Sequence, residues 1–372
     1  MLSYIELTNF KIFKQKTRIN FKATKYESLK DSNTKYGCIK TALFYGQNGS
    51  GKTSILKAIS SLIEMIFRDV KFAPTNICSF SKRKESTIKY GFLIDGNEIE
   101  YSFTININSD IKEEQLFVNK EEVFLRIGTS AKTVFISNCE PQDIDSKVLF
   151  LKALKFRYGF KELAVLDKWF NFLKNSIIVD EKTNIFKYSP EITNDSDIFN
   201  FLNNEGDKKI NEFFEAQGIP YELISEKVNV FGQTQLFVSL KNKVVDNKIG
   251  IHLESYGNRI LLNYLIHILA VEKSGGMILF DEFGGGLHNK LNELLLRYMN
   301  KNLNNVQTFI CTHETNLMKT VLTRPDQIYL VDFSQDGSFI KRASDFNPRE
   351  AQNIEKMYLA GVFGGMPTYN KN

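Results

Sequence analysis

A glycine-rich segment of the sequence has the residue types and spacing needed to bind phosphate groups. It reads Gly46-Gln47-Asn48-Gly49-Ser50-Gly51-Lys52-Thr53 and matches the pattern G-x-x-x-x-G-K-[ST]. Glycines let successive backbone N–H groups and the start of the next helix face an anion. Lys52 would neutralise phosphate charge, and the Thr53 hydroxyl would be a ligand of Mg²⁺. The segment therefore predicts a nucleoside triphosphate site.

Two adjacent carboxylates follow an apolar segment much later in the chain. Asp281 and Glu282 come directly after Met277–Phe280, a pattern typical of a buried parallel strand whose carboxyl end meets a nucleotide crevice. There Asp281 would hold Mg²⁺, and Glu282 would polarise the attacking water as a general base. A strand that ends in Asp-Glu is also common on protein surfaces, so this prediction depends on the phosphate loop.

Two further segments could contact phosphate. His313 follows the apolar strand Val306–Cys311, where a histidine could reach a γ-phosphate and sense its hydrolysis. The alternative is an ordinary surface histidine. The turn Ser255-Tyr256-Gly257 precedes a predicted helix, and such a turn is either a helix cap or a second anion site.

The predicted elements place these segments on one sheet. An apolar segment at 39–45 precedes the phosphate loop, and an amphipathic helix at 53–67 follows it. Strands that alternate with helices predict a parallel sheet with crossover helices. The alternating elements are helices at 258–272, 288–302 and 315–321, and strands at 277–281, 306–312 and 326–332.

Short β segments and a helical stretch fill the rest of the chain. Two strands are expected within 2–21, a hairpin around Asp95-Gly96, and a small β unit at 113–136. Helix-like segments broken by polar clusters predict a helical insertion at 146–218. Strand patterns return at 222–230, 235–241 and 248–253. We therefore expect two halves of one core, 1–145 and 219–372, around the insertion.

Composition excludes several classes of protein. The 372 residues include 48 Lys and Arg against 43 Asp and Glu, a net charge of +5, and 42% are hydrophobic. These values are average for a globular protein and exclude a disordered or fibrous chain. The four cysteines show neither zinc-site nor disulfide spacing. Without a signal peptide or an apolar membrane span, we expect a cytoplasmic protein.

The order of the motifs resembles the ATPase heads of ABC transporters and of SMC-like chromosome and repair proteins. Within that group, the chain looks most like a family of bacterial AAA-type ATP/GTP-binding proteins of abortive-infection and other phage-defence systems. The passages that carry the resemblance are LSYIELTNFKIF, GQNGSGKTS, ESYGNRILLNYL, DEFGGGLH with ICTHETNLM, and the ending YLAGVFGGMP. The resemblance implies an α/β P-loop NTPase of the ABC/SMC-head type, a mixed sheet with an N-terminal antiparallel β unit and an inserted helical lobe.

The family pattern assigns roles to residues of this sequence. Catalytic roles fall on Lys52, Glu282 and the switch histidine His313, and metal contacts on Thr53, Asp281 and Gln142. The residues that correspond to nucleotide-binding motifs are Gly46, Gln47, Asn48, Gly49, Ser50, Gly51, Lys52, Thr53 and Ser54 (Walker A), Ser255, Gly257 and Asn258 (signature), and Leu287 with His288 (D-loop). His288 replaces the Asp of transporter D-loops, which bears on the hydrolysis rate rather than on nucleotide binding.

The resemblance also implies cofactors, partners and a function. ATP and Mg²⁺ would bind at the interface of a head-to-tail homodimer, or of a higher oligomer, between Lys52 and Thr53 of one copy and Ser255 and Gly257 of the other. The function would be an ATP-driven switch in bacterial defence that acts with a separate effector protein and without a membrane.

Two alternatives stay open. One is a DNA-binding repair ATPase with a short-armed head, and the other is a scaffold that binds ATP and seldom hydrolyses it. In the first, nucleic-acid phosphates would contact basic residues, which are Lys11, Lys14, Lys16, Arg18, Lys22, Lys82, Arg83 and Lys84. The excess of five positive charges is weak support for such a partner. The segment after His313 is too short for an added nuclease domain of about 100 residues.

Overall fold

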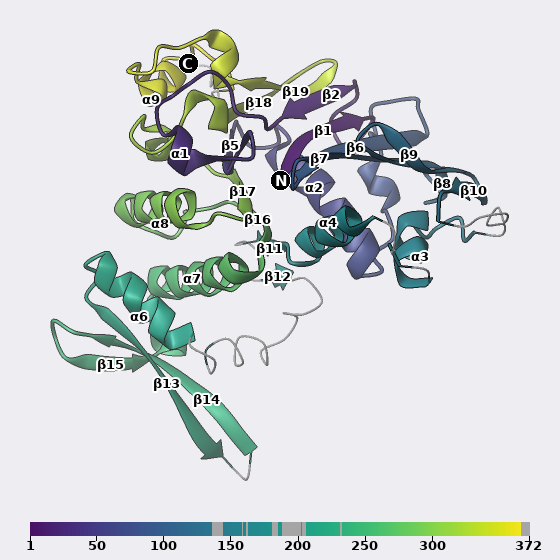
Figure 1. The fold of residues 1–372 in the computed structure, drawn as a ribbon. Helices are drawn as coiled ribbons and strands as arrows, with labels where there is room; N and C mark the ends of the chain where they lie inside the picture. The colour runs from purple at the N-terminus through teal and green to yellow at the C-terminus, as the bar shows by residue number, and fades with distance from the viewer. Residues whose placement is uncertain are drawn as a thin grey trace.

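Two seven-stranded sheets form the framework of the molecule (Figure 1). The computed structural model describes residues 1–135, 144–157, 159–160, 163–180, 185–187, 202, 206–230 and 233–365. Helix α2 (Lys52–Phe67) lies between the two sheets, with twelve of its residues buried. None of the described helices combines the length and the apolar character that a bilayer crossing needs.

The central sheet is mixed, with a parallel core. Its order is β12-β11-β16-β17-β5-β18-β19, and the strands from β11 to β18 run parallel while β12 and β19 pair antiparallel at the edges. The strands are β5 (Thr41–Tyr45), β11 (Ile177–Asp180), β12 (Ile185–Lys187), β16 (Gly276–Asp281), β17 (Val306–Cys311), β18 (Ile328–Ser334) and β19 (Gly337–Arg342). The predicted parallel sheet is therefore confirmed.

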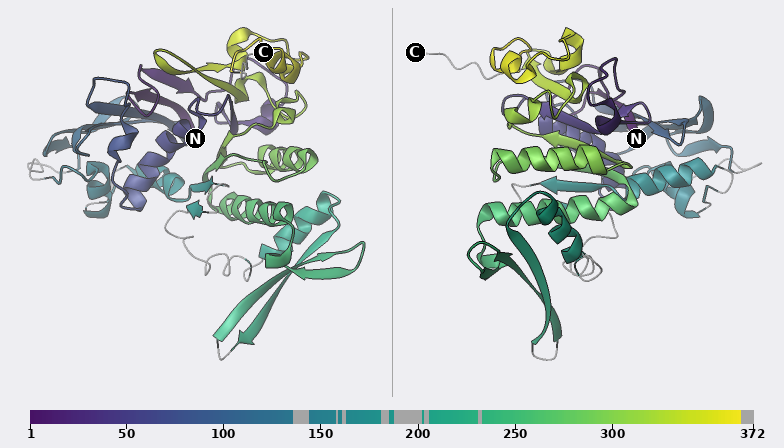
Figure 2. Two further views of the ribbon diagram at one scale, coloured as in Figure 1. Left: turned by 180° about the vertical axis from the view of Figure 1, so that it is seen from behind. Right: turned by 60° about the vertical axis from the view of Figure 1, so that its left-hand side comes forward.

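Both faces of the central sheet are buried, because successive side chains of a strand point to opposite faces. In β16, Met277 and Leu279 pack on the side of α2, whereas Ile278 and Phe280 pack on the opposite side. Helices α2 and α4 (Ala164–Lys174) cover the first face, and α7 (Tyr256–Ser274) and α8 (Asn289–Asn302) cover the second (Figures 1 and 2). Nearly continuous apolar strands are what such double coverage requires.

The second sheet is antiparallel and N-terminal, with the order β10-β9-β8-β7-β6-β1-β2. Its predicted hairpin is confirmed: Asp95 and Gly96 have φ values of 48° and 80°, as a type I′ turn requires. The strands are β1 (Leu2–Thr8), β2 (Thr17–Asn20), β6 (Glu85–Ile94), β7 (Asn97–Asn106), β8 (Ile111–Val118), β9 (Glu121–Ile127) and β10 (Ser130–Thr133).

Part of the expected helical insertion belongs to this framework. Helices α3 (Phe150–Arg157) and α4 pack into the same apolar cluster as α2, and β11 pairs in parallel with β16. The buried carboxylate of Glu114 in β8 accepts hydrogen bonds from the N–H groups of Phe150 and Leu151, at 2.7 and 2.8 Å, which attaches α3 to the N-terminal sheet. The expected helical insertion was wrong for β11 and β12, because periodicity does not distinguish strands of three or four residues from helix.

A smaller unit projects from the body beside α7 (Figures 1 and 2). It consists of α6 (Asp207–Ala216) and the sheet β13 (Tyr221–Val230), β14 (Gln233–Asn242) and β15 (Asn247–Gly250). The helix expected at 315–321 is replaced by a short 3-10 turn, η4 (Thr315–Met318), where the Thr323 hydroxyl donates to Leu317 O at 2.6 Å. The remaining elements are α1 (Lys30–Asn33), β3 (Thr34–Lys35), β4 (Cys38–Ile39), the 3-10 turns η1 (Pro74–Asn76), η3 (Ile251–Leu253), η5 (Pro325–Gln327) and η6 (Ala343–Phe346), and α9 (Ile354–Leu359).

Candidate functional site

The phosphate loop joins β5 to α2 and closes around its own lysine. Lys52 Nζ donates to the carbonyl oxygens of Gly46 and Gln47, at 2.7 and 3.2 Å. Gly49 and Gly51 have φ values of +78° and +114°, where L side chains are strained. The loop therefore has the curled backbone that its glycines predict.

The loop is braced from two sides and contains an orphaned hydroxyl. Ser50 O accepts from the Ser338 hydroxyl of β19 at 2.7 Å, and a Cβ on Gly51 would lie 2.9 Å from Ile12 of the β1–β2 turn. Ser50 Oγ is buried and has no hydrogen-bond partner in the described part of the chain. Because a buried polar atom without a partner is costly, this loop fits an anionic ligand.

The remaining Walker A positions lie at the rim of the loop. Asn48 and Thr53 are exposed, Ser54 is half-buried in the first turn of α2, and Gln47 Nε2 lies 3.5 Å from Asp332 Oδ1 of β18. Exposed polar groups at this rim leave the loop open to solvent and therefore to a ligand.

The two predicted magnesium ligands contact one another. Thr53 Oγ1 donates to Asp281 Oδ1 at 3.1 Å, across the carboxyl end of the sheet. Magnesium prefers oxygen ligands and is usually held by one or two protein oxygens together with substrate phosphates. Among the described residues no cluster of three His, Cys, Asp or Glu side chains could hold a metal by itself. The hydroxyl and the carboxylate therefore fit a magnesium ion that arrives with a nucleotide.

Glu282 and His313 form a second pair at the same edge. Glu282 Oε2 lies 3.9 Å from His313 Nε2, with the two side chains 25% and 48% exposed. Glu282 has a φ of 63°, which is uncommon for a residue other than glycine and often marks a functional site. A solvent-accessible carboxylate beside an imidazole can accept or pass on a proton.

Two hydrogen bonds to the backbone of Phe283 hold the residue after Glu282 in place. Phe283 N–H donates to Cys311 O at 2.9 Å, and the Thr312 hydroxyl donates to Phe283 O at 2.8 Å. Burial raises the pKa of the Cys311 thiol well above its usual range, with Asp281 adding to the effect, so this cysteine stays a neutral core residue. The sequence did not predict Thr312 as part of the site, although a polar residue between an apolar strand and His313 was a signal.

The signature segment lies against the loop that follows Asp281 and Glu282. Ser255 Oγ accepts from Asn258 N–H at 3.3 Å and caps α7, and Asn258 Nδ2 donates to Glu254 at 2.9 Å. A Cβ on Gly257 would lie 3.0 Å from Gly286 O. The capping interpretation is thus confirmed, and the N-terminus of α7 remains exposed.

The two predicted D-loop residues, Leu287 and His288, differ in their exposure. Leu287 is buried, while His288 is exposed and caps α8, with its Nδ1 accepting from Lys290 N–H at 3.2 Å. Gln142, the candidate metal-contacting glutamine, lies outside the described residues. The structure therefore brings together Lys52, Thr53, Asp281, Glu282 and His313.

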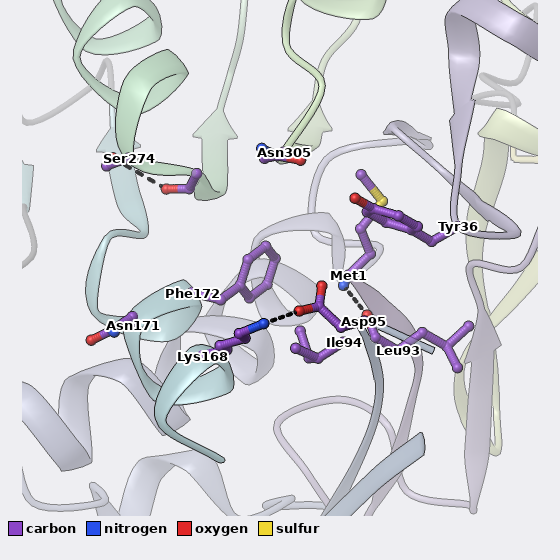
Figure 3. A pocket seen from close by; sticks show the side chains of 11 residues that line it. Met1, Tyr36, Leu93, Ile94, Asp95, Lys168, Asn171, Phe172, Ser274 and Asn305 are labelled. Carbon is purple, nitrogen blue, oxygen red and sulfur yellow. Dashed lines mark hydrogen bonds and ion pairs between the residues drawn. The ribbon is translucent and has the colours of Figure 1, made fainter. Parts of the chain in front are cut away.

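A different pocket lies at the other end of the parallel strands, away from Asp281 and His313 (Figure 3). It has a volume of about 340 Å³ and is lined by Tyr36, Phe172, Gly275, Asn305 and the ion pair of Asp95 with Lys168. Gly275 and Asn305 precede β16 and β17, so the pocket is at the amino ends of these strands. Ligands of open α/β sheets bind at the carboxyl ends, which separates this pocket from the site above.

Comparisons with solved structures agree with this fold. The chain is similar to the SMC head domain from Thermotoga maritima, with a TM-score of 0.52 and 16% identity over 92% of this chain and 98% of that one. It is also similar to an SmcHead bound to the C-winged helix domain of ScpA (TM-score 0.54, 15% identity, 95% and 99% covered). A third match is an Smc head domain with an extended coiled coil bound to the C-terminal domain of ScpA derived from Pyrococcus furiosus (0.54, 14%, 96% and 98%).

Sequence comparison gives the family. Among curated proteins none matches the chain. Residues 42–153 and 191–319, well over half of the sequence, match a family of P-loop ATPases, and the first matched segment contains the phosphate loop. The expected fold and family resemblance are both confirmed, and membership implies that the loop binds a nucleotide. The chain belongs to the family described as "AAA domain, putative AbiEii toxin, Type IV TA system" and has the fold of an SMC head.

Proposed function

We propose that this chain is an ATPase that works as a nucleotide-driven dimerisation switch. The observation that carries the proposal is the convergence of two contacts at one sheet edge, Thr53 with Asp281 and Glu282 with His313. A metal ligand, a base and a phosphate sensor would then act on the same triphosphate.

Each side chain has a distinct task in this reaction. Lys52 exchanges its bonds to the loop carbonyls for bonds to phosphate oxygens, which charge assistance favours. Thr53 and Asp281 would hold Mg²⁺, which would neutralise phosphate charge. Glu282 accepts a proton from the attacking water, and His313 contacts the γ-phosphate until it leaves.

The exposed start of α7 supports a head-to-tail dimer. Leu253 and Tyr256 are 73% and 53% exposed on either side of Ser255, and exposed apolar side chains at such a turn suit an interface. The N-terminus of this 19-residue helix can receive an anion. In the dimer that anion is the γ-phosphate on the partner's loop, so ATP joins the two copies and hydrolysis separates them.

The family description supports a role in bacterial defence, since it names a toxin of a type IV toxin–antitoxin system. The switch would sense an invader or restrain a separate effector protein. Two of the similar SMC heads are bound to a separate protein, ScpA, which supports a head that passes its nucleotide state to another chain.

The concentration dependence of ATP hydrolysis tests the proposal. Composite sites at a dimer interface predict a rate per chain that rises with protein concentration and then levels off. A rate per chain that is constant over the whole range contradicts the dimer, and the absence of any hydrolysis contradicts the ATPase.

One structural observation favours DNA binding as a second candidate function. A groove of about 710 Å³ gathers four of the expected basic residues, which are Lys11, Lys82, Arg83 and Lys84. In contrast, Lys16 and Arg18 lie 2.9 and 4.0 Å from Glu6. No Asp or Glu is among the described residues that line this groove, so its positive charge suits phosphates.

A salt titration of duplex DNA binding separates the two functions. DNA recognition predicts affinity that falls steeply with salt, rises with ATP, and is lost when Lys82, Arg83 and Lys84 are changed to alanine. Changing Lys16 and Arg18 is the matched control. Flat salt dependence without an effect of ATP rejects the DNA-binding function.

A further inference from the structure

The loop that follows Glu282, residues 283–287, lies directly against the start of α7. A Cβ on Gly286 would lie 2.3 Å from Ile260 Cδ1 and 2.8 Å from Tyr256 Cε1, and both of these residues belong to α7. The backbone of the loop is therefore in contact with the helix. Because protein interiors are close-packed and transmit strain, a shift of the helix is passed on to this loop.

Tyr264 of α7 makes a second contact with the same loop. Its side chain is buried, and its Oη accepts a hydrogen bond from Gly284 N–H at 3.3 Å. Its ring stacks on that of Phe283, with the centroids 5.0 Å apart and the planes at 11°. Phe283 and Gly284 are the two residues directly after Glu282. One side chain thus holds both a ring and a backbone group that follow the proposed general base.

The backbone of Glu282 requires such support. Its φ of 63° is uncommon for a residue other than glycine, and a conformation of this kind persists only where the surrounding structure over-determines it. Phe283 supplies part of the restraint, because its ring also meets that of Phe280 edge-on at 5.1 Å. Tyr264 supplies the restraint that comes from α7, and it fixes the direction in which the chain leaves Glu282.

Packing alone does not explain the Tyr264 hydroxyl. A phenylalanine at this position would keep the stacking on Phe283 and the apolar burial. It would leave the N–H group of the buried Gly284 without this acceptor, and a buried donor that loses its partner is costly. The hydroxyl therefore serves the backbone of the loop after Glu282.

We propose that Tyr264 is a positioning residue for ATP hydrolysis, through which α7 keeps Glu282 directed at the attacking water. This inference rests on the proposed ATPase function. Among the hydrogen bonds and ring contacts of the described residues, Tyr264 reaches Phe280, Phe283 and Gly284 but not the phosphate loop. Its loss should therefore slow the chemical step and leave nucleotide binding intact.

The test measures kcat, KM and ATP affinity for two variants of Tyr264. We expect kcat to fall about 10-fold in Tyr264→Phe, which loses only the hydrogen bond, and about 100-fold in Tyr264→Leu, which also loses the stacking, since a shift of about 1 Å can cost this much. ATP affinity should stay within about twofold of the parent.

Tyr329→Phe is the matched control. Tyr329 of β18 is 2% exposed, and its hydroxyl donates to Asn20 O at 2.6 Å. The control therefore removes the same atom from another buried tyrosine that bonds the backbone. It should lower the melting temperature and leave kcat unchanged.

A double-mutant cycle with Glu282→Gln separates positioning from general destabilisation. If Tyr264 acts through Glu282, Tyr264→Phe should not lower the residual single-turnover rate of Glu282→Gln any further. Additive losses, a kcat of Tyr264→Phe within about twofold of the parent, or an equal loss in Tyr329→Phe would overturn the proposal. If Tyr264→Leu does not fold, Tyr264→Phe alone decides by the same criteria.

Hydrogen exchange without nucleotide keeps this test independent of the proposed function. If the parent chain shows no hydrolysis, the ATPase proposal fails, but the amides of 283–287 should still exchange faster in Tyr264→Phe than in the parent. Their exchange in Tyr329→Phe should match that of the parent. Equal exchange in the parent and in Tyr264→Phe would refute the positioning role.

Discussion

The Thr53 hydroxyl donates to Asp281 Oδ1 at 3.1 Å although the two residues are 228 positions apart in the sequence. Thr53 lies in the first turn of α2, which follows β5, and Asp281 is the last residue of β16. These two strands are not neighbours, because β17 lies between them. The two side chains therefore meet across the end of β17, the strand that leads to His313. Sheet order alone thus places His313, the proposed phosphate sensor, beside the predicted metal ligands.

Removal of the Lys52 amine should abolish tight nucleotide binding. In Lys52→Ala, the charge-assisted bonds to phosphate are lost, so ATP affinity should fall about 100-fold, close to 3 kcal/mol. Isothermal titration calorimetry measures this change. Lys57→Ala is the control, since Lys57 lies on the same helix and pairs with Glu64. Equal ATP affinity in the Lys52 variant and the parent would show that the loop is not the phosphate site.

The Thr312 hydroxyl should matter for both stability and turnover. It donates to Phe283 O and accepts from Glu314 N–H. Thr312→Val keeps the shape but removes a buried hydrogen bond to Phe283 O and a partly buried one from Glu314 N–H, which costs about 1–3 kcal/mol. The melting temperature and the rate of ATP hydrolysis should both be lower in this variant, whereas Thr312→Ser should resemble the parent. A valine variant as stable and active as the serine variant would contradict the bridging role.

Because His267 is fully buried, we expect mild acid to destabilise the fold. Burial lowers the pKa of His267 from 6.5 to about 3. Between these values the unfolded chain binds a proton that the folded chain excludes, so stability is complete above pH 6.5 and declines as the pH falls. At pH 5.5 the loss should be about 1.4 kcal/mol.

Comparison of melting temperatures at pH 7.5 and 5.5 measures this loss. His267→Leu should show a smaller difference between the two pH values than the parent. His252→Leu is the control, because His252 is exposed. The same pH sensitivity in the parent and in His267→Leu would exclude this histidine as its source.

The sequence predicted the parts of the site that local patterns encode. The phosphate loop, the Asp-Glu pair and His313 each combine residue type with a flanking strand or helix, and sheet topology then brings them to one edge. The role of Thr312 could not be predicted in this way. It depends on contacts between loops distant in sequence, and a polar residue beside an apolar segment gives only a weak signal of such contacts.

For the fold as well, the sequence predicted the elements that have a local signal and missed those that depend on tertiary contacts. The Asp95-Gly96 hairpin follows from turn chemistry, and the helix after the phosphate loop follows from its periodicity. Strand β11 was missed because three apolar residues and an aspartate after a helix show no distinguishing period. The attachment of α3 was also hidden, since Glu114 and Arg126 form a fully buried ion pair whose partners are set by tertiary structure.

The molar mass in solution of the Glu282→Gln variant, measured with ATP and Mg²⁺, tests the proposed dimerisation switch most directly. Without the base, ATP stays bound, so light scattering should show a dimer of about twice the 42.8 kDa chain, whereas the sample with ADP should remain monomeric. Addition of Ser255→Arg, on the surface predicted to face the partner, should restore the monomer without loss of ATP binding. A Glu282→Gln chain that binds ATP and stays monomeric at all concentrations would contradict the dimerisation switch.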